Sequence, residues 1–308
     1  MSRHTVLVPM RWRRCRWLGF TALLMVLTGA AGAQSVRSPF KSDPAIICDA
    51  CPGWNATLEP FRIFGNTYYV GTRGLSSVLV TSRGGHILLD GGLPQSAEII
   101  DRNVRELGYR TEDIKLIVNS HAHYDHAGGI HALQQASGAS IAASASGASA
   151  LMRGENTTDD PQYGFGRAAN GFPPVANVRV VKDGEMLRVG QLSITAHLTP
   201  GHTPGSTTWT WKSCEESRCL DVVYADSLTA TVGPGFKYSS DPARVARFRK
   251  GIETVAALPC DIVISVHPDF TNLMDKIAKK DFVDPQGCRA YATFGTRSLD
   301  AQLAREQQ

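Results

Sequence analysis

Short apolar segments separated by glycine-bearing turns predict strands in the first half of the chain, from Phe61 onward. These segments lie at residues 61–64, 67–71, 76–82, 86–92, 114–120 and 140–144. Apolar residues recur at helical spacing over 96–108, which predicts a helix that ends at Gly108. Two further helices are expected at about 129–135 and at 146–153.

The second half repeats this order of strands followed by helices. Its predicted strands lie at residues 178–183, 185–189, 192–199, 206–211, 220–226 and 261–266. Helices are predicted at 242–258, which has one apolar face, and at about 287–305. Residues 34–60 are expected to form an irregular N-terminal arm, and 154–177 a long loop. Two halves of this kind predict an α/β fold with two sheets face to face and helices outside.

The first 33 residues have a different character from the rest of the chain. Five arginines precede the apolar segment LGFTALLMVLTGA, and Ala31-Gly32-Ala33 forms a small-residue cleavage site. This order is typical of a signal peptide, so we expect residues 1–33 to be removed and 34–308 to form a single domain. A retained N-terminal anchor is the alternative, although the apolar segment is short for a membrane span. After cleavage we expect no membrane association.

Removing this segment changes the charge of the chain. The full sequence has 32 lysines and arginines, five of them in the first 33 residues, which leaves 27 against 28 aspartates and glutamates. The mature chain is therefore nearly neutral. Since it has no basic stripe or basic patch with interleaved aromatic residues, we expect no nucleic-acid partner.

Six cysteines remain once Cys15 is removed with the signal peptide. An even number in an exported chain indicates disulfides, and the leader and the cysteines together favour the periplasm. The natural pairing is local: Cys214 with Cys219, Cys260 with Cys288, and Cys48 with Cys51. The last pair, in CDAC, is ambiguous. A structural-zinc site would need a second cysteine or histidine pair nearby, a thioredoxin-like motif would need a βαβ context, and neither is present.

The segment VNSHAHYDHAGGI places three of the nine histidines within six residues. His121 and His123 are two apart, so on an extended backbone their side chains point to one side and can bind one ion. If a helix begins at Asp125, this residue and His126 can point together at a second ion. Imidazole and carboxylate without thiolate suit zinc. The alternative is that Asp125 caps a helix and the histidines are surface groups.

Two more histidines follow predicted strands and can complete such a site. His202 lies in LTPGHTPGST, after the strand at 192–199, and His267 directly follows the strand at 261–266. Each alone could be an ordinary loop histidine, but together with the first motif both are expected to be ligands. His197 falls within a strand and is expected to be a core residue or to contact a ligand.

The order HAHYDH, PGHTPG and His267 resembles the metallo-β-lactamase superfamily through most of residues 60–290. Two details are similar to subclass B3: Ser227 in YADSLTA, where other lactamase subclasses have a metal-binding cysteine, and the segment from Cys51 to Ser82. The resemblance implies an αββα sandwich of two mixed β-sheets with helices on the outer faces. It also implies two zinc ions per chain, with His121, His123 and His202 on the first and Asp125, His126 and His267 on the second.

The resemblance further implies hydrolysis of the β-lactam ring of penicillins, cephalosporins and carbapenems, by a hydroxide held between the two zinc ions. Asp125 is assigned to catalysis as well as to zinc binding, and Asp90 in LLDGG is expected to orient the ligand-bearing loop. Ser227 and Thr229 are candidates for binding the substrate carboxylate. Alternatively, these two hydroxyls only satisfy backbone groups at a strand end.

Other zinc hydrolases share this motif, including glyoxalase II-like thioesterases and acyl-homoserine lactonases. They use an additional bridging aspartate on the strand that here ends in YAD, which makes Asp226 the residue that tests this alternative. A non-catalytic metal-binding protein is a third possibility, but all six expected ligand positions are filled. We therefore expect a monomeric enzyme whose partner is a small-molecule β-lactam, although the sequence does not fix the oligomeric state.

Overall fold

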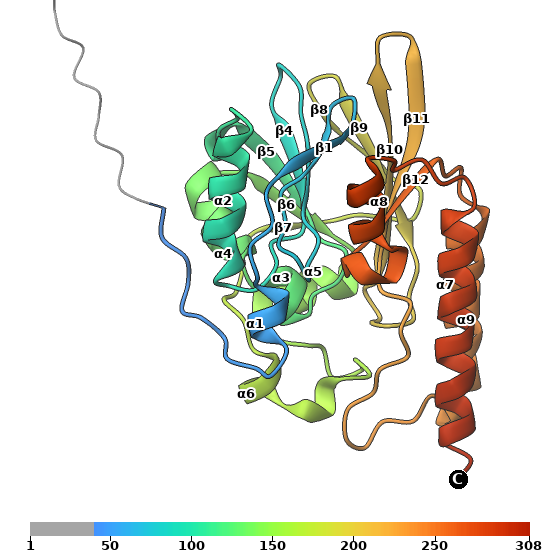
Figure 1. The fold of residues 1–308 in the computed structure, drawn as a ribbon. Helices are drawn as coiled ribbons and strands as arrows, with labels where there is room; N and C mark the ends of the chain where they lie inside the picture. The colour runs from blue at the N-terminus through green and yellow to red at the C-terminus, as the bar shows by residue number, and fades with distance from the viewer. Residues whose placement is uncertain (1–39) are drawn as a thin grey trace, which may run out of the picture. The chain divides into compact units, whose positions relative to one another are not determined.

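Two mixed β-sheets form the centre of the computed structural model, which describes residues 40–308 (Figure 1). In the first sheet, seven strands follow one another in chain order. They are β1 (Phe61–Phe64), β2 (Thr67–Tyr69), β3 (Val78–Val80), β4 (His86–Leu89), β5 (Ile114–Val118), β6 (Ser140–Ala143) and β7 (Val178–Val180). Pairing is antiparallel from β1 to β4 and parallel from β4 to β7.

The second sheet has five strands in the order β12-β11-β10-β9-β8. They are β8 (Met186–Val189), β9 (Leu192–Leu198), β10 (Thr207–Glu215), β11 (Arg218–Ala225) and β12 (Ile262–Ser265). Strands β8 to β11 pair antiparallel, whereas β12 runs parallel to β11. As a result β9, β11 and β12 all run in the same direction, and their carboxyl ends lie at the same edge of the sheet.

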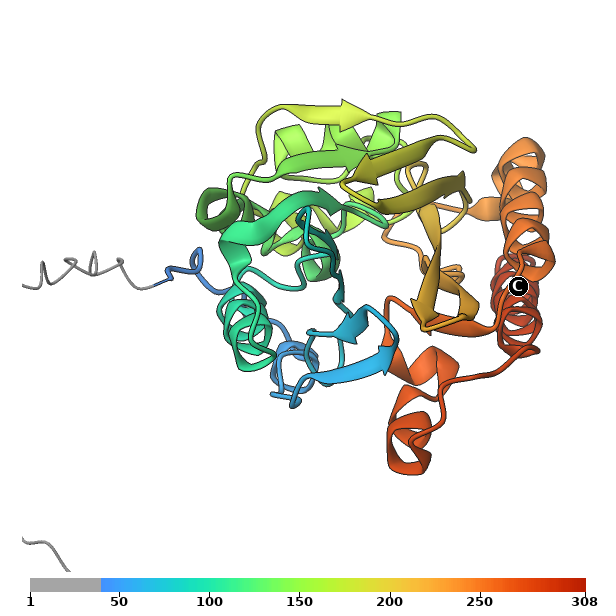
Figure 2. The same ribbon diagram turned by 90° about the horizontal axis from the view of Figure 1, so that it is seen from above.

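Helices cover the outer face of each sheet or lie at the ends and edges of the two sheets (Figures 1 and 2). They are α1 (Cys51–Trp54), α2 (Ser96–Glu106), α3 (Tyr124–Ala127), α4 (Ile130–Ser137), α5 (Ala145–Arg153), α6 (Arg167–Asn170), α7 (Pro242–Ala257), α8 (Leu273–Lys279) and α9 (Gly287–Arg305). Four 3-10 helices accompany them in the described part: η1 (Thr111–Asp113), η2 (Tyr163–Phe165), η3 (Tyr238–Ser240) and η4 (Pro268–Thr271).

Three groups of buried apolar side chains correspond to the three interfaces between these layers. One group, which includes Val118 and Trp209, fills the space between the two sheets. A second, which includes Ile100 and Leu133, packs α2 and α4 against the first sheet. A third, which includes Phe248, packs α7 and α9 against the second sheet. The αββα sandwich predicted for this chain is therefore confirmed.

In addition to α6, which forms within the loop expected at 154–177, two helices differ from the sequence prediction. The arm at 34–60 was expected to be irregular, but α1 forms within it, and Cys51 and Trp54 pack on Leu75 and Leu93. Helix α8 was not predicted, because only part of one face is apolar: Leu273 is buried and its neighbours Met274 and Ile277 are half-buried against the core. Both short helices depend on tertiary contacts, which local sequence patterns do not reveal.

Disulfides join all three of the cysteine pairs that were expected to be local. They link Cys214 with Cys219, Cys260 with Cys288, and Cys48 with Cys51. The Cys214–Cys219 bridge connects β10 and β11 at directly opposed positions. The predicted signal peptide at 1–33 lies outside the described residues. Within 40–308 no helix is long and apolar enough to cross a membrane.

Candidate metal centre

The loop after β5 carries the histidine motif, and a buried aspartate fixes its backbone. Asp90 follows β4, has a left-handed backbone with φ of 58° and is fully buried. Its carboxylate accepts hydrogen bonds from the Asn119 side chain, from the backbone N–H and hydroxyl of Ser120, and from the Tyr224 hydroxyl. Burial raises the pKa of Asp90 to about 6, although these donors oppose the shift. Asp90 is therefore hydrogen-bonded to Asn119 and Ser120, the two residues directly before His121.

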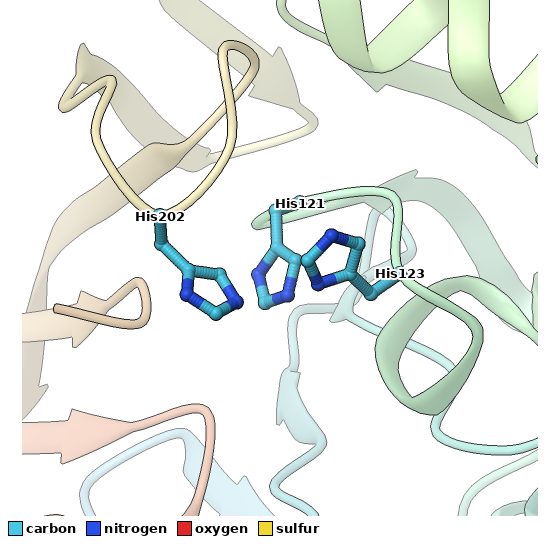
Figure 3. Close-up of side chains that lie close together, drawn as sticks. All are labelled: His121, His123 and His202. Atoms are coloured by element: carbon cyan, nitrogen blue, oxygen red, sulfur yellow. The ribbon is translucent and has the colours of Figure 1, made fainter. Parts of the chain in front are cut away.

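His121, His123 and His202 converge from two loops at the edge of the sheets (Figure 3). Ring centroids are 4.7 Å apart for His121 and His123, 4.8 Å for His121 and His202, and 4.9 Å for His123 and His202. Each ring offers a nitrogen atom to a group in which all such atoms lie within 4.8 Å of one another. The three residues are buried, so a cation between them would be largely shielded from water.

Each of these rings is held by a hydrogen bond on the side that faces away from the other two. The bonds are His121 Nδ1 to Asp226 Oδ1 (2.6 Å), His123 Nε2 to Asp160 Oδ2 (3.1 Å) and His202 Nδ1 to the Thr229 carbonyl oxygen (2.9 Å). Such bonds leave His121 Nε2, His123 Nδ1 and His202 Nε2 to face the centre, and His202 Nε2 also lies 3.4 Å from the side-chain nitrogen of Gln162. His121 Nε2 is buried and has no hydrogen-bond partner among the described residues. An oriented imidazole with one free nitrogen is what a zinc ion requires.

Burial keeps two of these imidazoles in the neutral form that binds metal. Burial, together with the neighbouring histidines, lowers the pKa of His121 well below its usual value and that of His202 to about 3. Burial also lowers the pKa of His123, but the Asp160 carboxylate raises it overall. The sequence analysis did not identify Asp160, which lies in the long loop at 154–177, because nothing in its local sequence separates it from neighbouring polar residues.

Asp125, His126 and His267 form a second group beside the first. The distances are 3.2 Å from Asp125 Oδ2 to His126 Nε2, 3.4 Å from Asp125 Oδ2 to His267 Nε2, and 3.3 Å between the two Nε2 atoms. Ligand atoms about 2.0–2.1 Å from a tetrahedral zinc ion are about 3.3–3.4 Å apart, so these three atoms fit such an ion. The adjacent rings of His121 and His126, 4.5 Å apart, connect the two groups.

Solved structures similar to this chain include metallo-β-lactamases. A family model described as the metallo-β-lactamase superfamily matches residues 70–214. The solved structure of the Rm3 metallo-β-lactamase is 51% identical, with a TM-score of 0.82 over 85% of this chain and 100% of that one. MEM-A1, a subclass B3 metallo-β-lactamase isolated from a soil metagenome library, is 48% identical, with a TM-score of 0.80 over 82% of this chain and 98% of its own.

The chain belongs to the metallo-β-lactamase superfamily. Its similarity to Rm3 and MEM-A1 confirms the predicted resemblance to subclass B3 and agrees with the predicted enzyme class. Curated relatives are more distant: an acyl-coenzyme A thioesterase from Gallus gallus and a hydroxyacylglutathione hydrolase from Anaeromyxobacter dehalogenans are each 28% identical. The chain spans 43% and 55% of their lengths, about half. The superfamily and the histidine-rich centre together imply zinc.

A cavity of about 330 Å³ opens onto this metallo-β-lactamase centre. The ligand candidates His123, Asp125, His202 and His267 line it, as do the hydroxyls of Ser227 and Thr229. These two hydroxyl oxygens are 3.1 Å apart, and Thr229 Oγ1 is also 3.1 Å from His202 Nδ1. Ser227 and Thr229 can therefore both face a substrate, while Thr229 also supports a ligand.

In this metallo-β-lactamase fold, the Asp226 carboxylate is hydrogen-bonded to His121 Nδ1. Its carboxylate lies on the opposite side of the ring from Nε2, the atom that faces the centre, and it is fully buried. Burial raises its pKa, and the His202 ring opposes the shift. In this arrangement Asp226 orients a ligand, which differs from the bridging role expected of it in a thioesterase or lactonase.

Proposed function

We propose that this protein is a periplasmic zinc-dependent β-lactamase that hydrolyses penicillins, cephalosporins and carbapenems and thereby confers antibiotic resistance. The observation that carries the proposal is the first group of three histidines and, beside it, the close approach of Asp125, His126 and His267, with Asp226 hydrogen-bonded to His121. We assign His121, His123 and His202 to the first of two zinc ions. The second ion is assigned to Asp125, His126 and His267.

When bound, the two ions would supply a hydroxide nucleophile at neutral pH and polarise the lactam carbonyl. The residues of the chain have separate tasks. Asp226, Asp160 and the Thr229 carbonyl each hold one imidazole by one nitrogen and leave the other directed at the centre, and Asp90 holds the loop that carries the motif. This preorganisation means that no ligand must reorient during the reaction.

Asp125 has a catalytic task in this scheme in addition to binding metal. Its Oδ2 atom faces His126 and His267, whereas its Oδ1 atom has no hydrogen-bond partner among residues 40–308. Asp125 lines the cavity, so Oδ1 can accept a hydrogen bond from the attacking nucleophile and orient it. Ser227 and Thr229 are assigned to the carboxylate of the substrate, because both can donate a hydroxyl hydrogen into the cavity.

A paired assay tests this function. Purified mature protein is given a chromogenic cephalosporin, a carbapenem and a lactoylglutathione thioester, each with and without a chelator. We expect hydrolysis of both β-lactams, loss of that activity with the chelator and its recovery when zinc is added back. Hydrolysis of the thioester alone would instead support a glyoxalase II-like enzyme. The two curated relatives that act on thioesters are similar to this chain over only part of their length.

A further inference from the structure

One wall of the cavity combines three aromatic rings with a carboxylate. Trp54, Tyr124, Asp269 and Phe270 all line it. The Trp54 ring lies 6.3 Å from that of Tyr124 and 5.4 Å from that of His267, and the Phe270 ring lies 5.2 Å from that of His267. The wall therefore offers a carboxylate and aromatic rings, with no lysine or arginine among the described residues that line the cavity.

The Asp269 carboxylate is available to a ligand. Asp269 is exposed, and its side chain accepts no hydrogen bond and forms no ion pair within residues 40–308. Lys276, on the helix that follows, pairs instead with Asp284 at 3.2 Å. The backbone at Asp269 is held in place because η4 begins directly after His267, and the Phe270 N–H donates to the His267 carbonyl oxygen at 3.1 Å.

An unpaired carboxylate beside aromatic faces is a favourable environment for an organic cation. Aromatic rings attract ammonium and other cationic groups through their negative faces, and a carboxylate adds a direct charge interaction. At the metal end of the same cavity, hydroxyls and bound zinc would favour a carboxylate. The cavity therefore combines groups that favour opposite charges: Ser227, Thr229 and a bound metal favour an anion, and Asp269 favours a cation.

We propose that Trp54, Tyr124, Asp269 and Phe270 form a subsite for a positively charged substituent of the substrate, such as a pyridinium or quaternary ammonium group. The proposal rests on the proposed function, since the cation is carried by a β-lactam. It predicts that zwitterionic β-lactams, with the carboxylate at the metal end and the cation at this wall, are preferred over matched neutral ones. A negatively charged substituent at the wall is disfavoured.

Two cephalosporins with the same thienylacetamido side chain test the charge preference. One has a pyridinium-methyl group at C3 and the other a neutral acetoxymethyl group, and kcat/KM is measured for each with the zinc-loaded mature protein. The ratio of the two values is compared between the wild type, Asp269→Asn and Asp275→Asn. Asp275 is the matched control because it is an exposed aspartate on the following helix that does not line the cavity.

We expect Asp269→Asn to lower the cationic-to-neutral ratio about fivefold, the effect of losing one exposed charge pair, and Asp275→Asn to leave the ratio unchanged. Raising the salt concentration to 0.5 M should reduce the ratio of the wild type towards that of Asp269→Asn. An unchanged ratio in Asp269→Asn, or an equal loss in Asp275→Asn, would overturn the subsite.

A second measurement separates the subsite from the proposed function. Benzyltrimethylammonium, which has no lactam ring, is titrated into each protein and its dissociation constant is measured by NMR. Weaker binding to Asp269→Asn than to the wild type and Asp275→Asn supports the subsite even if no β-lactam is hydrolysed, in which case only the proposed function fails. Equal binding to all three proteins, together with an unchanged substrate ratio, contradicts the subsite while β-lactam hydrolysis stands.

Discussion

Replacing Asp160 with alanine should weaken one zinc site and leave the other intact. The Asp160 carboxylate lies 3.1 and 3.2 Å from His123 Nε2 and is almost fully buried, so it fixes both the tautomer and the orientation of that ring. Loss of a partner of this kind typically weakens metal binding about 10- to 100-fold, or about 1.4–2.7 kcal/mol. Asp160→Asn keeps an oxygen that can accept the same bond, so its effect should be smaller, less than about tenfold.

Zinc affinity is measured by competition with a fluorescent chelator, and zinc per chain by metal analysis. Asp159→Ala is the matched control, because Asp159 is the adjacent, exposed aspartate and only its backbone carbonyl contacts Arg244. Asp160 also accepts the Gln162 N–H at 2.8 Å, so thermal unfolding of the metal-free proteins is measured to separate folding from metal binding. If Asp160→Ala bound zinc within twofold of wild type, or no more weakly than Asp159→Ala, the positioning role of Asp160 would be refuted.

Three further predictions concern the second metal group, the support of the motif and the C-terminal disulfide. His267→Ala should reduce bound zinc from about two ions per chain towards one, and unchanged metal content would remove His267 from the site. Tyr224→Phe removes a buried hydroxyl that lies 2.9 Å from Asp90 Oδ2, and should lower the free energy of unfolding by about 1–3 kcal/mol in chemical denaturation; a change below about 0.5 kcal/mol would argue against this support. Replacing Cys260 and Cys288 with alanine opens a bridge across 28 positions and should cost about 3–4 kcal/mol by the same measurement, whereas free thiols in the unreduced wild type would contradict the bridge.

Most strands and long helices could be predicted from the sequence because their patterns are local. The predicted strand at 61–64 coincides with β1, and the helix predicted at 242–258 corresponds to α7. The strands of the β10–β11 hairpin extend further than predicted, to Glu215 and from Arg218, because cross-strand pairing continues through polar residues beside the disulfide. Pairing between the two strands therefore makes β10 and β11 longer than the hydrophobic pattern predicts.

In the candidate site, too, local sequence patterns predicted some features and tertiary contacts decided others. Residue chemistry and spacing in VNSHAHYDHAGGI identified His121, His123, Asp125 and His126 as a group, since neighbouring residues on one loop must lie close together. His202 and His267 could be added because each follows a strand, and the carboxyl ends of parallel strands share an edge of a sheet.

By itself, the sequence determined the order of the strands and helices, the ligand-bearing loop and the resemblance to a family. Tertiary structure alone decided which nitrogen of each histidine faces the centre, because that depends on Asp160, Asp226 and the Thr229 carbonyl, which come from separate loops. It also brought Asp269 and Trp54, more than 200 residues apart in the chain, to the lining of the same cavity. Side-chain orientation and long-range proximity arise only from packing, so no local pattern records them.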